Sequence, residues 1–123
     1  MRQILIRIVQ RILNRSPLEN HIQAGLTVGK KFHMMEEVTI DVSHCWHITI
    51  GDDVTLAPRV QIFAHDASTK KLLGYTRIGK VRIGNRVFVG AGSIILPGVT
   101  IGNDVVVGAG SIVTHDVPGG TVV

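Results

Sequence analysis

A strict six-residue repeat runs from Ile83 to Pro118 and limits what this chain can fold into more than any other feature. The segment divides into six consecutive words: IGNRVF, VGAGSI, ILPGVT, IGNDVV, VGAGSI and VTHDVP. The first residue of every word is Ile or Val, and the fifth is Val or Ser. An α-helix would scatter these residues around its axis, because six residues turn it through about 600°. A fixed period of this length is typical of a parallel β-helix, in which each word supplies one short strand and one corner.

The two fixed positions predict how the prism is filled. The aliphatic first residues are expected to point inward from three flat walls, and the small fifth residues to lie near the corners. Gly and Asn between them supply backbone angles that bulkier residues reach only with strain. Each coil buries its aliphatic row by stacking on the next coil, so one repeat would not fold alone. A β-sandwich of irregular short strands is the alternative, but it gives no reason for six words in strict phase.

The phase continues upstream with less regularity. Further first positions are Val28, Ile40, Ile50, Leu56 and Ile62. The register slips around Trp46. The spacing from Ile62 to Ile83 fits three words and three extra residues, and the segment KKLLGY breaks the pattern. We therefore expect a loop at about residues 66–82 that leaves the prism directly after His65.

Length and composition fit one small domain. The chain has 123 residues, of which 45% are hydrophobic and only 4% aromatic, as suits a slim core of Ile and Val. The single cysteine, Cys45, excludes an internal disulfide framework and favours a reducing, cytoplasmic location. We expect Cys45 to be a small buried residue, with a catalytic thiol as the alternative.

The positive charge is concentrated near the N-terminus. Residues 1–31 carry six basic side chains and one acidic one, a net charge of +5, whereas the rest of the chain carries seven and eight, a net charge of −1. The repeat has no basic stripe with interleaved aromatic residues. This distribution argues against a nucleic-acid-binding face along the prism.

Residues 1–15 have the pattern of an amphipathic helix. The aliphatic residues at helical spacing are Ile4, Leu5, Ile8, Val9, Ile12 and Leu13, and the interspersed arginines are Arg2, Arg7, Arg11 and Arg15. Ser16 and Pro17 are expected to end the helix. We therefore divide the chain into an N-terminal helix, 1–17, and a β-helix domain, 18–123. The helix is too short and charged to span a bilayer, and we favour packing on the prism or on a neighbouring subunit over binding a membrane surface.

His65 is the candidate for acid–base chemistry among six histidines. It lies in IFAHDA, where the repeat becomes irregular and the long loop begins. At this point its side chain can leave the core and reach the rim of a cleft, where a neutral imidazole can accept a proton from a hydroxyl. The alternative is an ordinary solvent-exposed loop histidine.

The segments ITIGDDVTLAPRVQIFAHD and GAGSIILPGVTIGNDVVVGAGSIVTHDVP resemble the hexapeptide-repeat O-acetyltransferases. The chain is similar to the maltose, galactoside and serine acetyltransferases and to the sugar and capsule O-acetyltransferases, strongly over residues 49–123 and weakly over 26–48. The resemblance implies an all-β fold, a left-handed parallel β-helix with a short N-terminal α-helix. It also implies transfer of an acetyl group from acetyl-CoA to a hydroxyl of a sugar or small metabolite, without a metal, in a homotrimer with clefts between neighbouring prisms.

The resemblance assigns His65 as the general base that deprotonates the acceptor hydroxyl. It does not identify the carboxylate that orients the imidazole. Asp66 adjoins His65, but neighbours in a strand point to opposite faces. Family acceptor-binding residues fall one coil upstream, which here indicates Glu37 (beside Glu36) and Asp41. His47 lies three words before His65 and is added on that spacing; all three have the alternative of solvated corner residues.

For acetyl-CoA, the resemblance indicates the outer face of the later coils. The matching residues are Ala91, Ala109, Thr114 and His115. Small side chains there would let the pantetheine arm approach the backbone. The relatives continue past VPGGTVV with a basic closing turn and a helix, whereas this chain stops at Val123. We therefore expect one of two alternatives: a truncated C-terminal end, or an enzyme that binds CoA less tightly.

Two other functions remain open on the same fold. A metal enzyme like the γ-carbonic anhydrases would need three converging histidines, for which His44, His47 and His65 are the candidates. A non-catalytic assembly scaffold would fail to bind CoA.

Overall fold

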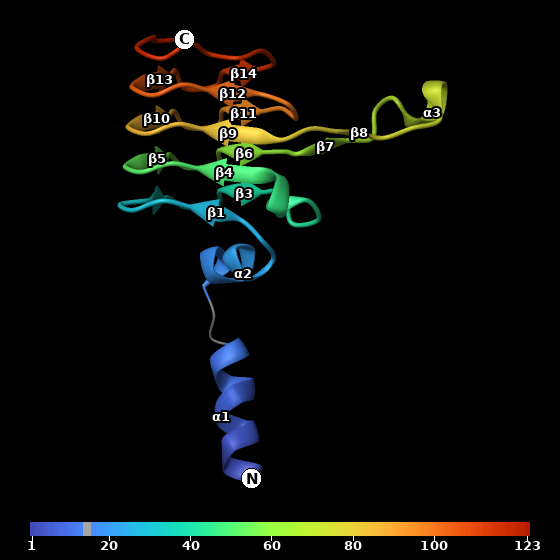
Figure 1. Ribbon diagram of the computed structural model, residues 1–123, viewed down its shortest axis with the longest axis vertical. Coiled ribbons are helices and arrows are strands. Elements are labelled where there is room, and N and C mark those ends of the chain that lie inside the picture. The colour runs from blue at the N-terminus through green and yellow to red at the C-terminus, as the bar shows by residue number, and fades with distance from the viewer. Residues whose placement is uncertain (14–15) are drawn as a thin grey trace.

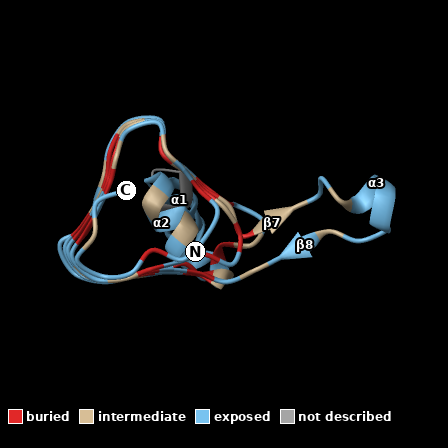
Figure 2. Ribbon diagram, turned by 90° about the horizontal axis from the view of Figure 1, so that it is seen from above, coloured by how far each residue is buried: buried red, intermediate tan, exposed pale blue. Residues whose placement is uncertain are grey.

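The structure, a computed structural model, describes residues 1–13 and 16–123, and only the backbone of residues 11–13. Figure 1 shows a stack of coils with two helices at one end and an arm at the side. Seen from above, the coils superimpose as a triangle, and the arm leaves from one corner (Figure 2). The stack is the expected parallel β-helix.

Three parallel sheets form the walls of the prism, and each contains one strand from each of four coils. Wall A consists of β1 (Thr27–Val28), β4 (Ile48–Ile50), β9 (Val81–Ile83) and β12 (Thr100–Ile101). Wall B consists of β2 (His33–Met34), β5 (Val54–Leu56), β10 (Val87–Val89) and β13 (Val105–Val107). Wall C consists of β3 (Thr39–Ile40), β6 (Gln61–Ile62), β11 (Ile94–Ile95) and β14 (Ile112–Val113).

The core is the row of aliphatic residues that the repeat predicts. All six first positions from Ile83 to Val113 are buried, as are Ile40, Ile50 and Ile62 upstream. The polar fifth residue Ser93 is also fully buried, and its hydroxyl donates to the carbonyl of Gly108 at 2.9 Å. The small fifth position thus accommodates a hydroxyl that joins two successive coils.

A ladder of side-chain hydrogen bonds joins the coils at the corner between walls A and B. The side-chain oxygens of Asp52, Asn85 and Asn103 accept from the backbone N–H of Lys30, Asp52 and Asn85, respectively, at 2.7 to 2.8 Å. Each donor lies one coil before its acceptor. A glycine precedes every member of the ladder because the coils meet closely here: a Cβ on Gly84 would lie 2.8 Å from the carbonyl carbon of Gly102.

Two insertions interrupt the coils, and both lie at the corner between walls C and A. The first contains the 3-10 helix η1 (Cys45–His47). Because of this insertion, Ile40 pairs with Ile62 at a separation greater than three words. The second is the arm, residues 65–78, made of β7 (His65–Asp66), α3 (Lys70–Leu73) and β8 (Arg77–Ile78).

The arm corrects one expectation from the sequence. Ile62 in wall C is followed directly by Ile83 in wall A, so the whole segment between them makes one step around the prism. The segment contains no additional six-residue words. It therefore exceeds one regular step by many more residues than the three that we expected from the sequence. The regular spacing of three words between paired positions holds only from Ile83 to Ile101 onward.

The N-terminal region contains two helices, α1 (Arg2–Leu13) and α2 (Pro17–Gln23). Residues 14 and 15 of the expected first helix lie outside the described residues. The helix α2 was not predicted from the sequence, and it begins where Ser16 and Pro17 were expected only to end a helix. Ser16 accepts a hydrogen bond from the N–H of Glu19 at 3.2 Å, so the segment SPLE is an N-cap followed by proline in the first turn.

The two helices differ in their contact with the prism. Leu18 of α2 packs against the core, and His21 lies 3.0 Å from the carbonyl oxygen of Ile40. In α1, by contrast, residues 2–10 are all exposed, so packing on the same chain's prism, one of the favoured uses of this helix, is not seen. Within the described residues, no helix is both long and apolar enough to cross a membrane.

Candidate active site

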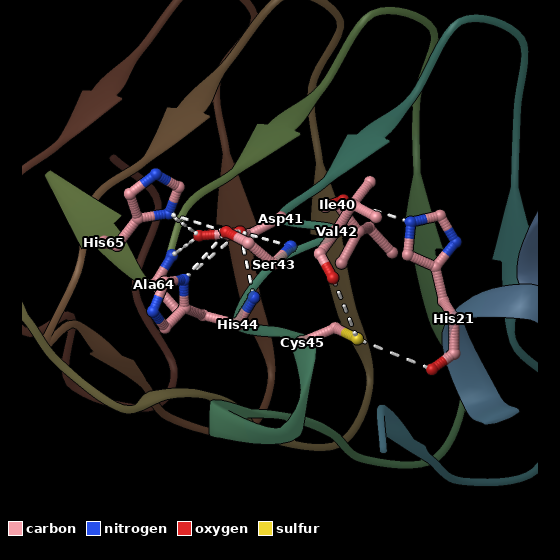
Figure 3. A network of polar contacts seen from close by, with 9 residues as sticks. All are labelled: His21, Ile40, Asp41, Val42, Ser43, His44, Cys45, Ala64 and His65. Atoms are coloured by element: carbon pink, nitrogen blue, oxygen red, sulfur yellow. Dashed lines mark hydrogen bonds and ion pairs between the residues drawn. The ribbon is translucent and has the colours of Figure 1, made fainter. Parts of the chain in front are cut away.

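Asp41 and His65 meet at the corner where the arm leaves the prism. Oδ2 of Asp41 lies 2.5 Å from Nδ1 of His65, although 24 positions separate them in sequence (Figure 3). Asp41 directly follows β3, and His65 begins β7 just after β6, the strand that pairs with β3. The pairing of Ile40 with Ile62 therefore places the two side chains on the same edge in consecutive coils.

The Asp41 carboxylate is buried and receives hydrogen bonds at both oxygens. Oδ2 accepts from the N–H of Ala64 at 2.9 Å as well as from His65. Oδ1 accepts from the N–H and the hydroxyl of Ser43, at 3.1 and 3.0 Å, and from the N–H of His44 at 3.1 Å. Burial alone raises the pKa of Asp41, but the hydrogen bonds from His65, Ala64 and Ser43 together outweigh it and hold the pKa below its ordinary value. Asp41 is therefore a fixed negative charge.

The contact with Asp41 determines which ring nitrogen of His65 is available for chemistry. An ionised carboxylate accepts only, so the Nδ1 that faces Asp41 carries a proton. Nε2 is then the unprotonated nitrogen of a neutral ring, and the side chain is 35% exposed, compared with 1% for Asp41. The imidazole thus offers a basic nitrogen to a molecule at the surface.

The backbone also holds His65 in place. β7 pairs with β8 in the antiparallel base of the arm, with His65 opposite Ile78. The neighbouring carboxylate of Asp66 accepts instead from the N–H of Ser68, at 2.9 Å. Asp66 therefore has its own local partner, as the alternation along a strand led us to expect.

An aromatic cluster continues from His65 along the same corner. The ring of His44 lies 4.7 Å from that of His65, centre to centre, and 5.2 Å from that of Trp46. His47 extends the row, with its ring 6.4 Å from His44 and 5.5 Å from Trp46. Trp46 is 56% exposed. No role was predicted for Trp46 from the sequence, where the available signal was a tryptophan between His44 and His47.

The remaining residues predicted on the acceptor side fall in different places. His47 lies at the same corner as His65 and contacts the aromatic cluster. Glu37 lies between β2 and β3, at the corner of walls B and C, so within this chain it is not near His65. Asp41 is at the site, but its carboxylate is buried and faces His65, so it is not free to contact an acceptor. Cys45 is buried as expected, and its thiol donates to the carbonyl of His21.

The four residues predicted to line the CoA groove flank the outer face of wall C in the last two coils. Ala91 and Ala109 lie at the corner where β11 and β14 begin, and the carbonyl of Ala91 accepts from the N–H of Gly110 at 2.8 Å. Thr114 and His115 lie at the corner where β14 ends, with Oγ1 of Thr114 2.7 Å from Nδ1 of His115. This second corner is the one from which the arm leaves.

Among the residues that the structure describes, Asp41, His44 and His65 form the group that could hold a metal ion. One ligand atom from each lies within 4.8 Å of the others. The Asp41 oxygens, however, already accept hydrogen bonds from four residues, including both histidines. The trio from the sequence analysis (His44, His47 and His65) forms a row, in which His44 separates the other two.

Comparison with known proteins agrees with the fold. Residues 80–115 match the family model described as "Hexapeptide repeat of succinyl-transferase". The chain is 38% identical to Protein CapG of Staphylococcus aureus over 129 aligned positions, covering 100% of the chain and 73% of that protein. It spans 60% of nodulation protein L of Rhizobium meliloti (strain 1021), to which it is 43% identical over 89% of the chain.

Solved structures of acetyltransferases are similar to this chain in the same way. The maltose O-acetyltransferase from Clostridium difficile 630 is 30% identical, with a TM-score of 0.67, over 98% of this chain and 79% of that one. The hexapeptide-repeat acetyltransferase VCA0836 from Vibrio cholerae O1 biovar eltor, complexed with acetyl-CoA, is also 30% identical, with a TM-score of 0.69 over 80% of this chain and 54% of that one. These likenesses confirm the fold class as a left-handed parallel β-helix. The chain belongs to the hexapeptide-repeat acetyltransferase family.

Proposed function

We propose that this protein transfers the acetyl group of acetyl-CoA to a hydroxyl of a sugar or small metabolite, with His65 as the general base and Asp41 as its positioning residue. The observation that carries the proposal is the hydrogen bond between buried, ionised Asp41 and Nδ1 of His65, which leaves Nε2 as the unprotonated nitrogen of a side chain that is 35% exposed. Names of relatives support the class of reaction: one is a maltose O-acetyltransferase, and another was solved with acetyl-CoA.

The chemistry needs one proton acceptor and correct placement of two substrates. The hydroxyl oxygen attacks the thioester carbonyl while Nε2 of His65 takes its proton. The C–O bond forms, the C–S bond breaks, and the proton passes from His65 to the departing CoA thiolate. Asp41 stabilises the imidazolium that exists between these transfers, because its carboxylate is already ionised and in contact. No metal and no acyl-enzyme are required, and placement of the substrates supplies much of the rate.

The aromatic cluster supports a sugar as the acceptor. Trp46 presents an exposed indole, and His44 lies between it and His65. A flat aromatic face with polar groups at its edge suits a ring that is apolar on its faces and hydroxylated around its rim. We assign Trp46 and His47 to the acceptor side of the site, and Ala91, Ala109, Thr114 and His115 to the acetyl-CoA side.

A homotrimer is the proposed working unit. The arm carries exposed apolar side chains that no described part of the same chain covers: Leu72 is 89% exposed, Leu73 59% and Tyr75 57%. Wall B also presents Phe88 and Val106, each 44% exposed, on its outer face. Such surfaces favour burial against a second copy. Sedimentation should give three chains, and a stable monomer at micromolar concentration would contradict this part of the proposal.

The single cysteine favours the cytoplasm as the location.

The decisive experiment is a panel of sugar and small-metabolite hydroxyl acceptors, with acetyl-CoA as donor and release of free thiol as the readout. His65→Ala should lower turnover by about two to four orders of magnitude and should leave acetyl-CoA binding, measured by calorimetry, unchanged. His33→Ala is the matched control, since His33 is exposed in β2 on wall B. If His65→Ala keeps turnover within a few-fold of the parent chain, another base performs the reaction. If acetyl-CoA does not bind, the scaffold alternative is favoured.

A further inference from the structure

The helix α1 exposes its apolar face to solvent. Ile4, Leu5, Ile8 and Val9 are 62%, 57%, 49% and 51% exposed. At helical spacing these four residues share one side of α1, and Gln3, Arg7 and Gln10 share the other. Figure 1 shows α1 beyond α2, clear of the stacked coils. A helix of 12 residues is marginal alone in water, so its stability depends on what covers this face.

The charge of α1 indicates what that partner is. The helix contains Arg2, Arg7 and Arg11 and no acidic residue, and the next residues up to 31 add more positive than negative charge. By helical spacing, Arg2 borders the apolar face, and Arg7 lies on the polar side with Gln3 and Gln10. The helix thus has aliphatic residues on one face, arginines beside them and no carboxylate. This pattern is typical of a segment that lies in the interface of an anionic bilayer.

A second copy of α1 fits these residues less well. Helices that pair in water over so short a length rely on complementary charges beside the apolar seam. Two copies of α1 would bring arginines together with no carboxylate to pair them. The prism of the same chain is also a poor partner, because its net charge outside residues 1–31 is only −1 and α1 makes no contact that buries residues 2–10.

We propose that α1 binds the surface of a membrane rich in anionic lipids and holds the β-helix beside it. The helix lies in the plane of the interface and does not span it, since 12 residues are too few to cross the hydrocarbon core. The aliphatic residues enter the boundary between headgroups and acyl chains, and the arginines meet the lipid phosphates. This binding is independent of the acetyl-transfer chemistry.

Cosedimentation of the full chain with vesicles tests the proposal. Vesicles of phosphatidylcholine with phosphatidylglycerol should bind the protein, and vesicles of phosphatidylcholine alone should bind it much less. Removing charge with Arg2→Gln and Arg7→Gln should weaken binding about fivefold for each arginine, since each contributes about a factor of five near an anionic surface. Arg82→Gln, on the outer face of wall A, is the matched control and should have no effect. Ile4→Ser with Ile8→Ser should abolish binding while leaving all arginines in place.

Two results would overturn the proposal. One is equal binding to neutral and anionic vesicles, or no binding to either at roughly 0.15 M salt. The other is a change of oligomeric state: if the Ile4→Ser, Ile8→Ser variant sediments with fewer chains than the parent, α1 is a contact between subunits. The proposed outcome is an unchanged molecular mass and unchanged thiol release with a soluble acceptor, together with loss of vesicle binding.

Discussion

Asp41 Oδ2 and His65 Nδ1 lie 2.5 Å apart, and this contact joins two consecutive coils at the corner from which the arm leaves. The carboxylate is buried and the imidazole is partly exposed, so the pair has one hidden and one accessible end. The hidden end fixes the proton on Nδ1, and the accessible end is the proposed general base. Several expected outcomes depend on this division.

Asp41→Asn should lower kcat by about two to four orders of magnitude. The amide can direct its oxygen to only one of the two sets of donors that the carboxylate serves. If the oxygen faces Ser43 and His44, the amide N–H meets His65 and stabilises the tautomer with its proton on Nε2, which is no longer a base. The KM for acetyl-CoA should change little. Ser43→Ala keeps the contact between Asp41 and His65 and should cost less than tenfold; an equal loss in both variants would mean that Asp41 has only a structural role.

The same carboxylate should make stability dependent on acidic pH. The pKa of Asp41 is below its ordinary value of 3.8 in the folded chain. Its contribution to the free energy of unfolding is therefore fully present above that value, and it is lost as pH falls through the depressed pKa of the folded state. Chemical denaturation from pH 7 to pH 2 should show the difference between the parent chain and Asp41→Asn shrinking over this acidic range. A difference that stays constant throughout would mean that Asp41 is not ionised in the folded protein.

Ala109→Trp should raise the KM for acetyl-CoA strongly and change the KM for the acceptor much less. Ala109 is exposed at the corner where wall C begins, on the proposed acetyl-CoA side. A pantetheine arm that lies against the backbone leaves no room for an indole. Thr27→Trp, in β1 at the other end of the stack, is the control and should leave both constants unchanged. If Ala109→Trp folds and binds acetyl-CoA normally, the groove lies on another face.

Gly84→Ala should destabilise the fold by about 1 to 3 kcal/mol, because the new methyl group would overlap the next coil. Its Cβ would lie 2.8 Å from the carbonyl carbon of Gly102, and the backbone cannot move there without disturbing the ladder at Asn85. Gly110→Asn is the matched control: no atom lies within 4 Å of its Cβ position, and asparagine tolerates a φ of 72°. Thermal denaturation should separate the two variants, and similar melting temperatures would contradict the close approach of coils at Gly84.

The regular part of the fold could be predicted from sequence because its cause is local. From Ile83 onward each word repeats the same steric demand, so the buried row and the corners follow from six-residue spacing. The two insertions interrupt the six-residue spacing, so the pairing of residues around them could not be predicted from it. At the first, paired positions such as Ile40 and Ile62 are separated by more than three words, so the residue one coil before His65 is Ser43 and not His47.

The role of Asp41 was missed for the same reason. Its contact with His65 depends on the length of the insertion that contains η1, and no periodic signal encodes that length. The helix α2, by contrast, could have been predicted from the sequence. The segment SPLE contains a capping serine, a proline in the first turn and Glu19 three positions after the cap. Ser16 and Pro17 were interpreted only as the end of the preceding helix.

The walls resume their register after the arm, with Ile50 paired to Ile83 and Ile83 paired in turn to Ile101. The arm therefore adds length at a corner without entering the stack, and its residues take no part in filling the core. Beyond His65 itself, selection can lengthen, shorten or rewrite the arm while the prism stays the same. In a lineage of such proteins, the length of the segment beside His65 and the thermal stability of the prism should consequently diverge at independent rates, since residues 66–78 lie outside the buried core.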